Sequence, residues 1–68
     1  MKVIINDIPI DLNGSGATLE QAVSHSGVND LRGLAVAVND TVIPRTTWNN
    51  FQLNENDTIT IIHATQGG

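Results

Sequence analysis

The sequence contains no cysteine and no tyrosine, a single tryptophan and a single phenylalanine, and only three lysines and arginines. Without cysteine the chain can form no disulfide, cannot act as a thiol nucleophile and cannot bind zinc through thiolates. Seven acidic residues against three basic ones give a net charge of -4, the wrong sign for binding the phosphate backbone of nucleic acids. We therefore expect no nucleic-acid partner, and any sulfur chemistry must use a chain end or another protein.

Long apolar runs are also missing. No stretch approaches the roughly 20 apolar residues that cross a membrane, and the start of the chain turns polar at Asn6, too soon for a secretory signal. We expect a cytoplasmic protein with no membrane partner. A chain of 68 residues forms one small domain that buries about 60% of its unfolded surface, so its stability must come from compact packing.

The first residues predict a β-hairpin. Residues 3–5 and 8–12 are rich in β-branched side chains, partly alternating with polar ones, and Asn6-Asp7 lies between them as a turn. Pro9 cannot donate a hydrogen bond to a neighbouring strand, so the second strand of this hairpin is expected at a sheet edge.

A short helix follows the hairpin. Thr18 and Gln21 have the spacing of a capping box, and the apolar residues Leu19, Ala22 and Val23 recur at the spacing of one helix face. Gly27 is expected just after the helix end.

The second half predicts another hairpin and a final strand. Residues 34–38 and 41–43 flank the turn Asn39-Asp40, and Pro44 ends the second of these strands. After the polar turn 54–57, residues 58–64 carry the strongest strand pattern of the chain.

The order of these elements predicts an α+β fold with a mixed sheet of about five strands and one main helix packed on one face. If the last strand is central, alternation directs Val3, Ile5, Val36, Val38, Ile59 and Ile61 toward the helix. Ile4, Ala35, Ala37 and Ile62 then lie on the open face, where they are expected to form an apolar patch. Within that patch we predict Ile4 and Ile62 as partner-binding residues.

The last strand runs directly into Thr65-Gln66-Gly67-Gly68. A Gly-Gly end has no Cβ beside its carboxylate and can enter a narrow active site. Because the tail has no apolar side chain to offset the entropy of ordering, residues 1–64 are expected as the folded domain and residues 65–68 as a flexible tail.

These features together resemble the ThiS family, the sulfur carrier proteins of thiamine biosynthesis, which have a ubiquitin-like β-grasp fold. The resemblance rests on Val38-Asn39, Ile43-Pro44-Arg45 followed by Trp48, Leu53, Asn56-Asp57, the β-branched last strand and Gly67-Gly68. It covers residues 34–68 by motif and the first 33 residues by strand order. Asn56 stands where the family usually has glycine. Asn tolerates a positive φ, so we expect the turn to be kept.

The resemblance implies that the chain is a protein co-substrate and not an enzyme. A ubiquitin-activating-like adenylyltransferase would use ATP to adenylate the Gly68 carboxylate, and a persulfide donor would then convert it to a thiocarboxylate. A thiazole synthase would receive the sulfur. The reactive residues are thus Gly68 and Gly67, Gln66 contacts a partner, and the chain itself binds no cofactor.

Two other functions stay open. The small subunit of molybdopterin synthase shares the fold and the Gly-Gly end, and a β-grasp interaction module could carry the glycines incidentally. Arg45 and Trp48 could contact a partner, but we favour a structural interpretation, in which Trp48 packs beside the sheet and Arg45 pairs with nearby carbonyl or carboxylate groups. His25 and His63 lack a third ligand, so no metal site is predicted.

Overall fold

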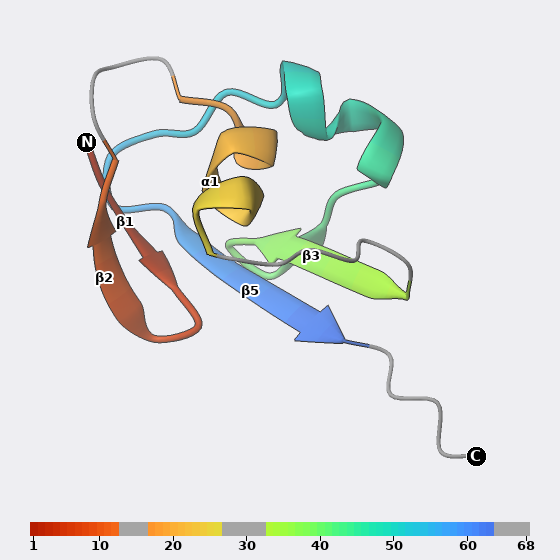
Figure 1. The fold of residues 1–68 in the computed structure, drawn as a ribbon, viewed down its shortest axis with the longest axis horizontal. Helices are drawn as coiled ribbons and strands as arrows, with labels where there is room; N and C mark the ends of the chain where they lie inside the picture. Colours follow the sequence, from red (N-terminus) through yellow and green to blue (C-terminus); the bar gives the residue numbers. More distant parts are fainter. Residues whose placement is uncertain (13–16, 27–32, 64–68) are drawn as a thin grey trace.

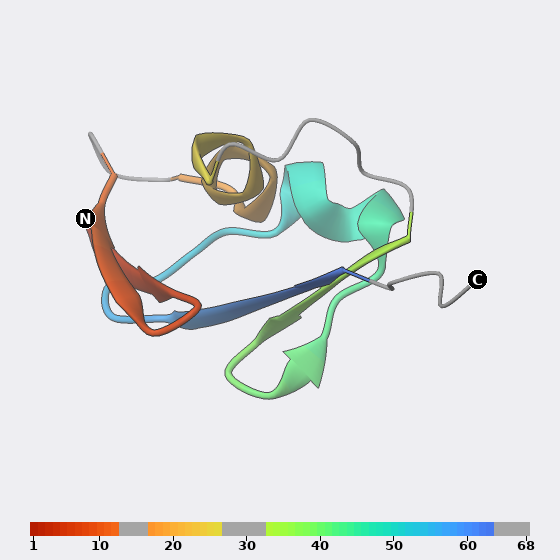
Figure 2. The ribbon, with the colours of Figure 1, turned by 60° about the horizontal axis from the view of Figure 1, so that its bottom comes forward.

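The computed structural model of the chain describes residues 1–12, 17–26 and 33–63. Along these residues the elements follow one another as β1 (Lys2–Ile5), β2 (Ile8–Asp11), α1 (Leu19–His25), β3 (Leu34–Val38), β4 (Thr41–Val42), the 3-10 helix η1 (Arg45–Asn50) and β5 (Thr58–His63). The strands form one sheet in the order β2-β1-β5-β3-β4. The α1 helix and η1 lie on the same side of this sheet (Figure 2).

The last strand, β5, is central, as predicted (Figure 1). It runs parallel to β1 and antiparallel to β3, so the sheet is mixed and the predicted β-grasp architecture is confirmed. Pro9 lies in the edge strand β2, opposite Ile4, where its missing N–H costs no hydrogen bond within the sheet.

The predicted capping box begins the helix. The Thr18 hydroxyl accepts a hydrogen bond from the backbone N–H of Gln21 at 3.3 Å, and the Gln21 side chain accepts one from the backbone N–H of Thr18 at 2.8 Å. The stripe of Leu19, Ala22 and Val23 is buried against the sheet. Gly27, expected after the helix end, lies outside the described residues.

The core lies between the sheet and the two helices. Its sheet side is formed by the six side chains expected there, Val3, Ile5, Val36, Val38, Ile59 and Ile61, all buried. This agreement confirms the predicted strand phase, in which successive side chains point to opposite faces.

The 3-10 helix was not predicted. Its residues are exposed except for Trp48, which is 3% exposed and whose indole N–H donates to the carbonyl of Ile43 at 2.8 Å. Trp48 therefore packs beside the sheet, as interpreted. Arg45 is exposed. The hydrogen bonds and ion pairs among the described residues do not include it, so its expected pairing stays a prediction.

Two strand ends differ slightly from the prediction. The strand expected over residues 41–43 stops at Val42, although the buried Ile43 still donates its N–H to the Val36 carbonyl at 2.9 Å. Ala64, expected as the last strand residue, lies outside the described residues. Asn56 adopts φ 69°, so the turn is kept without glycine, as expected.

Candidate functional site

The predicted reactive residues, Gly67 and Gly68, and the predicted contact residue Gln66 lie outside the described residues. The predicted domain boundary between residues 64 and 65 and the predicted mobility of the tail also concern residues outside the described part, so both stay predictions. What the structure describes is the body that would carry them: the end of β5 and the open face of the sheet, which is the face away from α1.

The open face is apolar around the end of β5. Ile62 of β5 lies opposite Ala35 of β3. Two residues along the sheet, on the same face, Ala37 of β3 lies between Thr60 of β5 and Val42 of β4. Ile62 is 55% exposed and Val42 is 69% exposed. We call Ile62, Ala35, Ala37 and Val42 the β5 patch. It includes three of the four residues predicted to form an apolar patch on the open face, together with Val42, which was not predicted.

Ile4 shares the open face with the β5 patch but lies apart from it. Its cross-strand partner on β5 is Thr58, and Ile62 follows Thr58 by four residues, or about 13 Å along the strand. Ile4 is also half-buried, whereas Ile62 is exposed. The two predicted partner-binding residues therefore share a face without being cross-strand neighbours.

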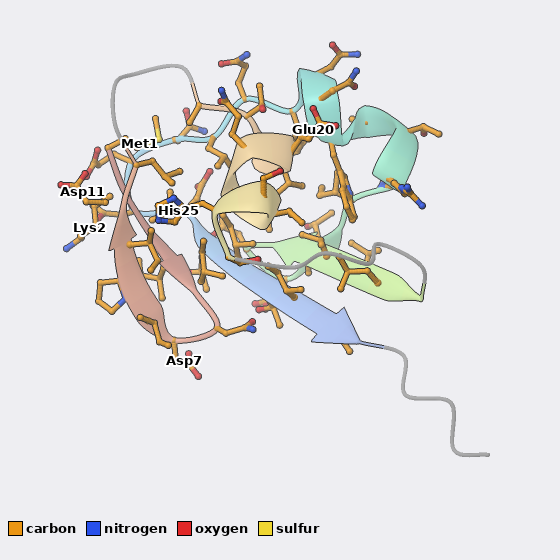
Figure 3. All side chains as sticks on the ribbon, in the orientation of Figure 1. Met1, Lys2, Asp7, Asp11, Glu20 and His25 are labelled. Carbon is orange, nitrogen blue, oxygen red and sulfur yellow. The ribbon has the colours of Figure 1, made fainter. Side chains whose placement is uncertain are left out.

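The four residues of the β5 patch are all uncharged. Lys2 and Asp11 form a cross-strand pair at the far end of the β1–β2 hairpin, where the amino group of Met1 lies 3.5 Å from Asp11 (Figure 3). This charged pair lies at the end of the sheet opposite to the end of β5, while other exposed charged residues, such as Asp40 in the β3–β4 turn, lie elsewhere. A partner that covers the β5 patch would have no charged group of this patch to desolvate.

Both hairpin turns hold β5 through asparagine side chains, which the sequence analysis missed. The Oδ1 atom of Asn6 accepts from the backbone N–H of Ile61 at 2.8 Å, and the Oδ1 atom of Asn39 accepts from the N–H of Thr58 at 3.0 Å. The available signal was the dipeptide Asn-Asp at both hairpin turns, residues 6–7 and 39–40, although the same dipeptide also occurs at residues 29–30 and 56–57. A turn pattern alone does not show which backbone amide such a side chain binds.

A buried carboxylate fixes the start of β5. Asp57 is 7% exposed, and its two oxygens accept from the Asn39 side-chain N–H at 3.0 Å and the Asn54 backbone N–H at 2.8 Å. Its backbone carbonyl accepts from the N–H of Ile4 at 2.9 Å. Asp57 therefore ties the turn before β5 to both neighbouring hairpins.

The helix side of the molecule carries a separate surface depression. It has a volume of about 470 Å³ and is lined by α1 residues, including Glu20 and His25, with Trp48 of η1. His25 is exposed near the end of α1. Within the described ranges, no three His, Cys, Asp or Glu side chains come together as a metal site, and no helix there is long and apolar enough to cross a membrane.

Comparisons with known proteins agree on one family. The ThiS family model matches residues 3–68. The chain is also similar to a crystal structure of the thiamine biosynthesis protein ThiS from Geobacter metallireducens, with a TM-score of 0.82 and 19% identity over 100% of both chains. The solution structure of a thiamine biosynthesis protein from the same organism matches with a TM-score of 0.77 and 19% identity, covering 100% of this chain and 88% of that one. No curated protein matches the sequence significantly.

Proposed function

The chain belongs to the ThiS family, the sulfur carrier proteins of thiamine biosynthesis, and from this membership we propose that it carries sulfur on the carboxyl group of its own Gly68. The observation that best supports the proposal is the path of the chain: β5 is the central strand and leads directly into Thr65-Gln66-Gly67-Gly68. The tail therefore starts at the most firmly held strand of the sheet. A partner can dock on the body while the tail reaches into its active site.

The proposed chemistry begins with activation, because a carboxylate is a poor electrophile. A carboxylate oxygen of Gly68 attacks the α-phosphorus of ATP, the bond to the β-phosphate breaks, and pyrophosphate leaves to give an acyl-adenylate. The ATP is bound by an adenylyltransferase partner of the ubiquitin-activating type. The carrier itself supplies the acyl group and binds no cofactor. This partner requirement is why we propose that the reaction runs in the cytoplasm, where ATP is available.

Sulfur then replaces one carboxyl oxygen. The terminal sulfur of a persulfide attacks the acyl carbon, and the carbon–oxygen bond to AMP breaks, which leaves an acyl disulfide. A thiol attacks the sulfur–sulfur bond and is oxidised to a disulfide, while the acyl sulfur leaves as the thiocarboxylate. We propose that a thiazole synthase then accepts this sulfur. The chain has no cysteine, so both the persulfide and the thiol must come from other molecules.

We also propose that the activating partner docks on the β5 patch, with Ile62 at its centre. Exposed apolar side chains near the middle of an interface contribute most when they are fully desolvated, and Ile62 is the exposed large apolar residue nearest the tail. Gln66 is proposed to contact the entrance of the active site. Ile4, half-buried and farther along the sheet, is proposed at the rim of the interface.

A deletion tests the reactive residue. Removing Gly68 leaves Gly67 as the end, about 3.3 Å short of the reacting position, and we expect ATP–pyrophosphate exchange by the partner to fall at least about a hundredfold. Gly68→Ala keeps the length but adds a methyl group beside the acyl carbon, so it should slow exchange less than deletion. Neither variant should change the melting temperature. Exchange at the wild-type rate with the deletion variant would refute the carrier function and favour an interaction module.

The molybdopterin alternative is disfavoured by the ThiS match over residues 3–68. A direct competition separates the two pathways: the thiocarboxylated protein is offered to a thiazole synthase and to the large subunit of a molybdopterin synthase. We expect sulfur transfer in the first reaction only. Transfer in the second reaction alone would assign the chain to molybdopterin synthesis.

A further inference from the structure

Asn6 occupies an unusual place for a turn residue, because it makes two hydrogen bonds to the central strand. Its backbone N–H donates to the carbonyl of Ile59 at 2.9 Å, and its side-chain Oδ1 accepts from the N–H of Ile61 at 2.8 Å. Strand β1 ends at Ile5. The Asn6 side chain thus continues the parallel ladder by one step after the backbone of β1 has turned away.

The two edges of β5 are held differently near the tail. On one edge, β3 pairs with β5 as far as His63, which lies opposite Leu34. On the other edge, β1 pairs only with Thr58 and Ile59, and among the described residues the Asn6 side chain is the last partner. One amide oxygen therefore holds this edge of β5 at its third residue from the end.

We propose that Asn6 is a positioning residue for the tail: its Oδ1 atom holds the end of β5 in the direction that presents Gly68 to the activating partner. The inference rests on the carrier function proposed above. A strand bonded on both edges stays in the plane of its sheet, whereas a strand bonded on one edge can twist about that edge. Residues 64–68 span at most about 17 Å when extended. So short a segment can compensate only in part for a displacement of the end of β5.

The conformation of the turn explains why Asn suits residue 6, which must both adopt a positive φ and accept a hydrogen bond from Ile61. Asn6 has φ 50° and Asp7 has φ 68°, as in the two-residue turns that suit a β-hairpin. Glycine adopts a positive φ more easily than any other residue, but it has no side chain to reach Ile61. Asn combines tolerance of this φ with an acceptor oxygen.

The second hairpin offers a matched control. Asn39 has the same φ of 50°, is followed by Asp40 at φ 72°, and also accepts from an amide of β5 through Oδ1. Its acceptor holds Thr58, the first residue of β5, and not the end near the tail. Asn39 also donates to Asp57, so replacing it should cost at least as much stability as replacing Asn6.

The test compares Asn6→Gly, Asn39→Gly and Asn6→Asp in the full chain. Both glycine variants keep the positive φ and lose the acceptor, whereas Asn6→Asp keeps an acceptor oxygen at the same place. In the free protein we expect Asn6→Gly to speed hydrogen exchange of the Ile61 amide and to raise the mobility of His63 by backbone relaxation. Asn39→Gly should leave the Ile61 exchange rate and the His63 mobility unchanged, and Asn6→Asp should keep both close to their wild-type values.

With the activating partner, we expect Asn6→Gly to lower kcat of ATP–pyrophosphate exchange about fivefold to tenfold with little change in KM. Asn39→Gly should stay within about twofold of the wild type, and Asn6→Asp should recover most of the rate. Unchanged Ile61 exchange in Asn6→Gly, or equal kcat losses in the two glycine variants, would overturn the positioning role. If the wild type is not activated at all, the carrier function fails, and the measurements on the free protein still decide whether Asn6 holds the end of β5.

Discussion

Replacing Ile61 or Ile62 with Asp should separate the two faces of β5 sharply, although the residues are adjacent. Ile61 is 7% exposed and Ile62 is 55% exposed. Truncating a buried Ile costs about 2 to 4 kcal/mol, and an unpaired carboxylate in the core adds at least about 2 kcal/mol. Ile61→Asp should therefore lose at least about 4 kcal/mol. A domain of this size is stable by only about 3 to 10 kcal/mol, so this variant should lose a large part of its stability or all of it.

Ile62→Asp should cost about 1 kcal/mol, because its carboxylate stays in water and only strand propensity and partial burial are lost. Urea unfolding followed by the fluorescence of Trp48, the one tryptophan of the chain, measures both variants. If Ile61→Asp does not fold, Ile61→Val replaces it, with an expected loss of about 1 kcal/mol against almost none for Ile62→Val. Equal losses at the two positions would refute the assignment of faces, since a shift of one residue exchanges them.

The other predictions concern docking, the buried carboxylate and the turns. Ile62→Asp, while folded, should raise the KM of the activating partner about tenfold or more and leave kcat nearly unchanged; an unchanged KM would remove the β5 patch from the interface. Asp57→Ala should destabilise the domain by about 3 kcal/mol, because Asn39 and Asn54 each lose a hydrogen bond to a charged acceptor. Urea unfolding checks this, and a loss under about 1 kcal/mol would contradict it. Asp40→Gly should stabilise the domain by about 0.5 kcal/mol, since glycine adopts φ 72° without strain. Its melting temperature should rise by about 2 to 4 °C, and a fall would show that the Asp40 side chain contributes to the turn.

Much of the fold could be predicted because its signals are local. Each of these signals acts over a few residues, so the sequence displays it directly: the hairpin turns at residues 6–7 and 39–40, the capping box at Thr18 and the alternation along residues 58–62. Central placement of β5 was the condition under which alternation assigned Ile59 and Ile61 to the buried face, and the structure meets that condition. By contrast, η1 has exposed residues around one buried Trp48, and one apolar residue in a polar stretch indicates no particular element.

The site was harder to predict because it depends on contacts between distant residues. Alternation assigned Ile4 and Ile62 to one face, but their separation depends on the register of β1 against β5, which no local pattern sets. The bond from Ile61 to Asn6 joins residues 55 apart in sequence. A side-chain acceptor in a turn can reach several backbone amides, and only the folded arrangement selects one.

The central claim is that the Gly68 carboxyl group carries the sulfur, and intact-mass spectrometry tests it most directly. The wild-type protein and the variant lacking Gly68 are incubated with the adenylyltransferase partner, ATP, a persulfide donor and a thiol. Their intact masses are then measured, and the modified site is located by fragmentation. We expect the wild-type mass to rise by the difference between one sulfur and one oxygen atom, located by fragmentation at Gly68, and the variant mass to stay unchanged. A wild-type protein that is adenylated but never gains sulfur, or a sulfur located at any other residue, would contradict the claim.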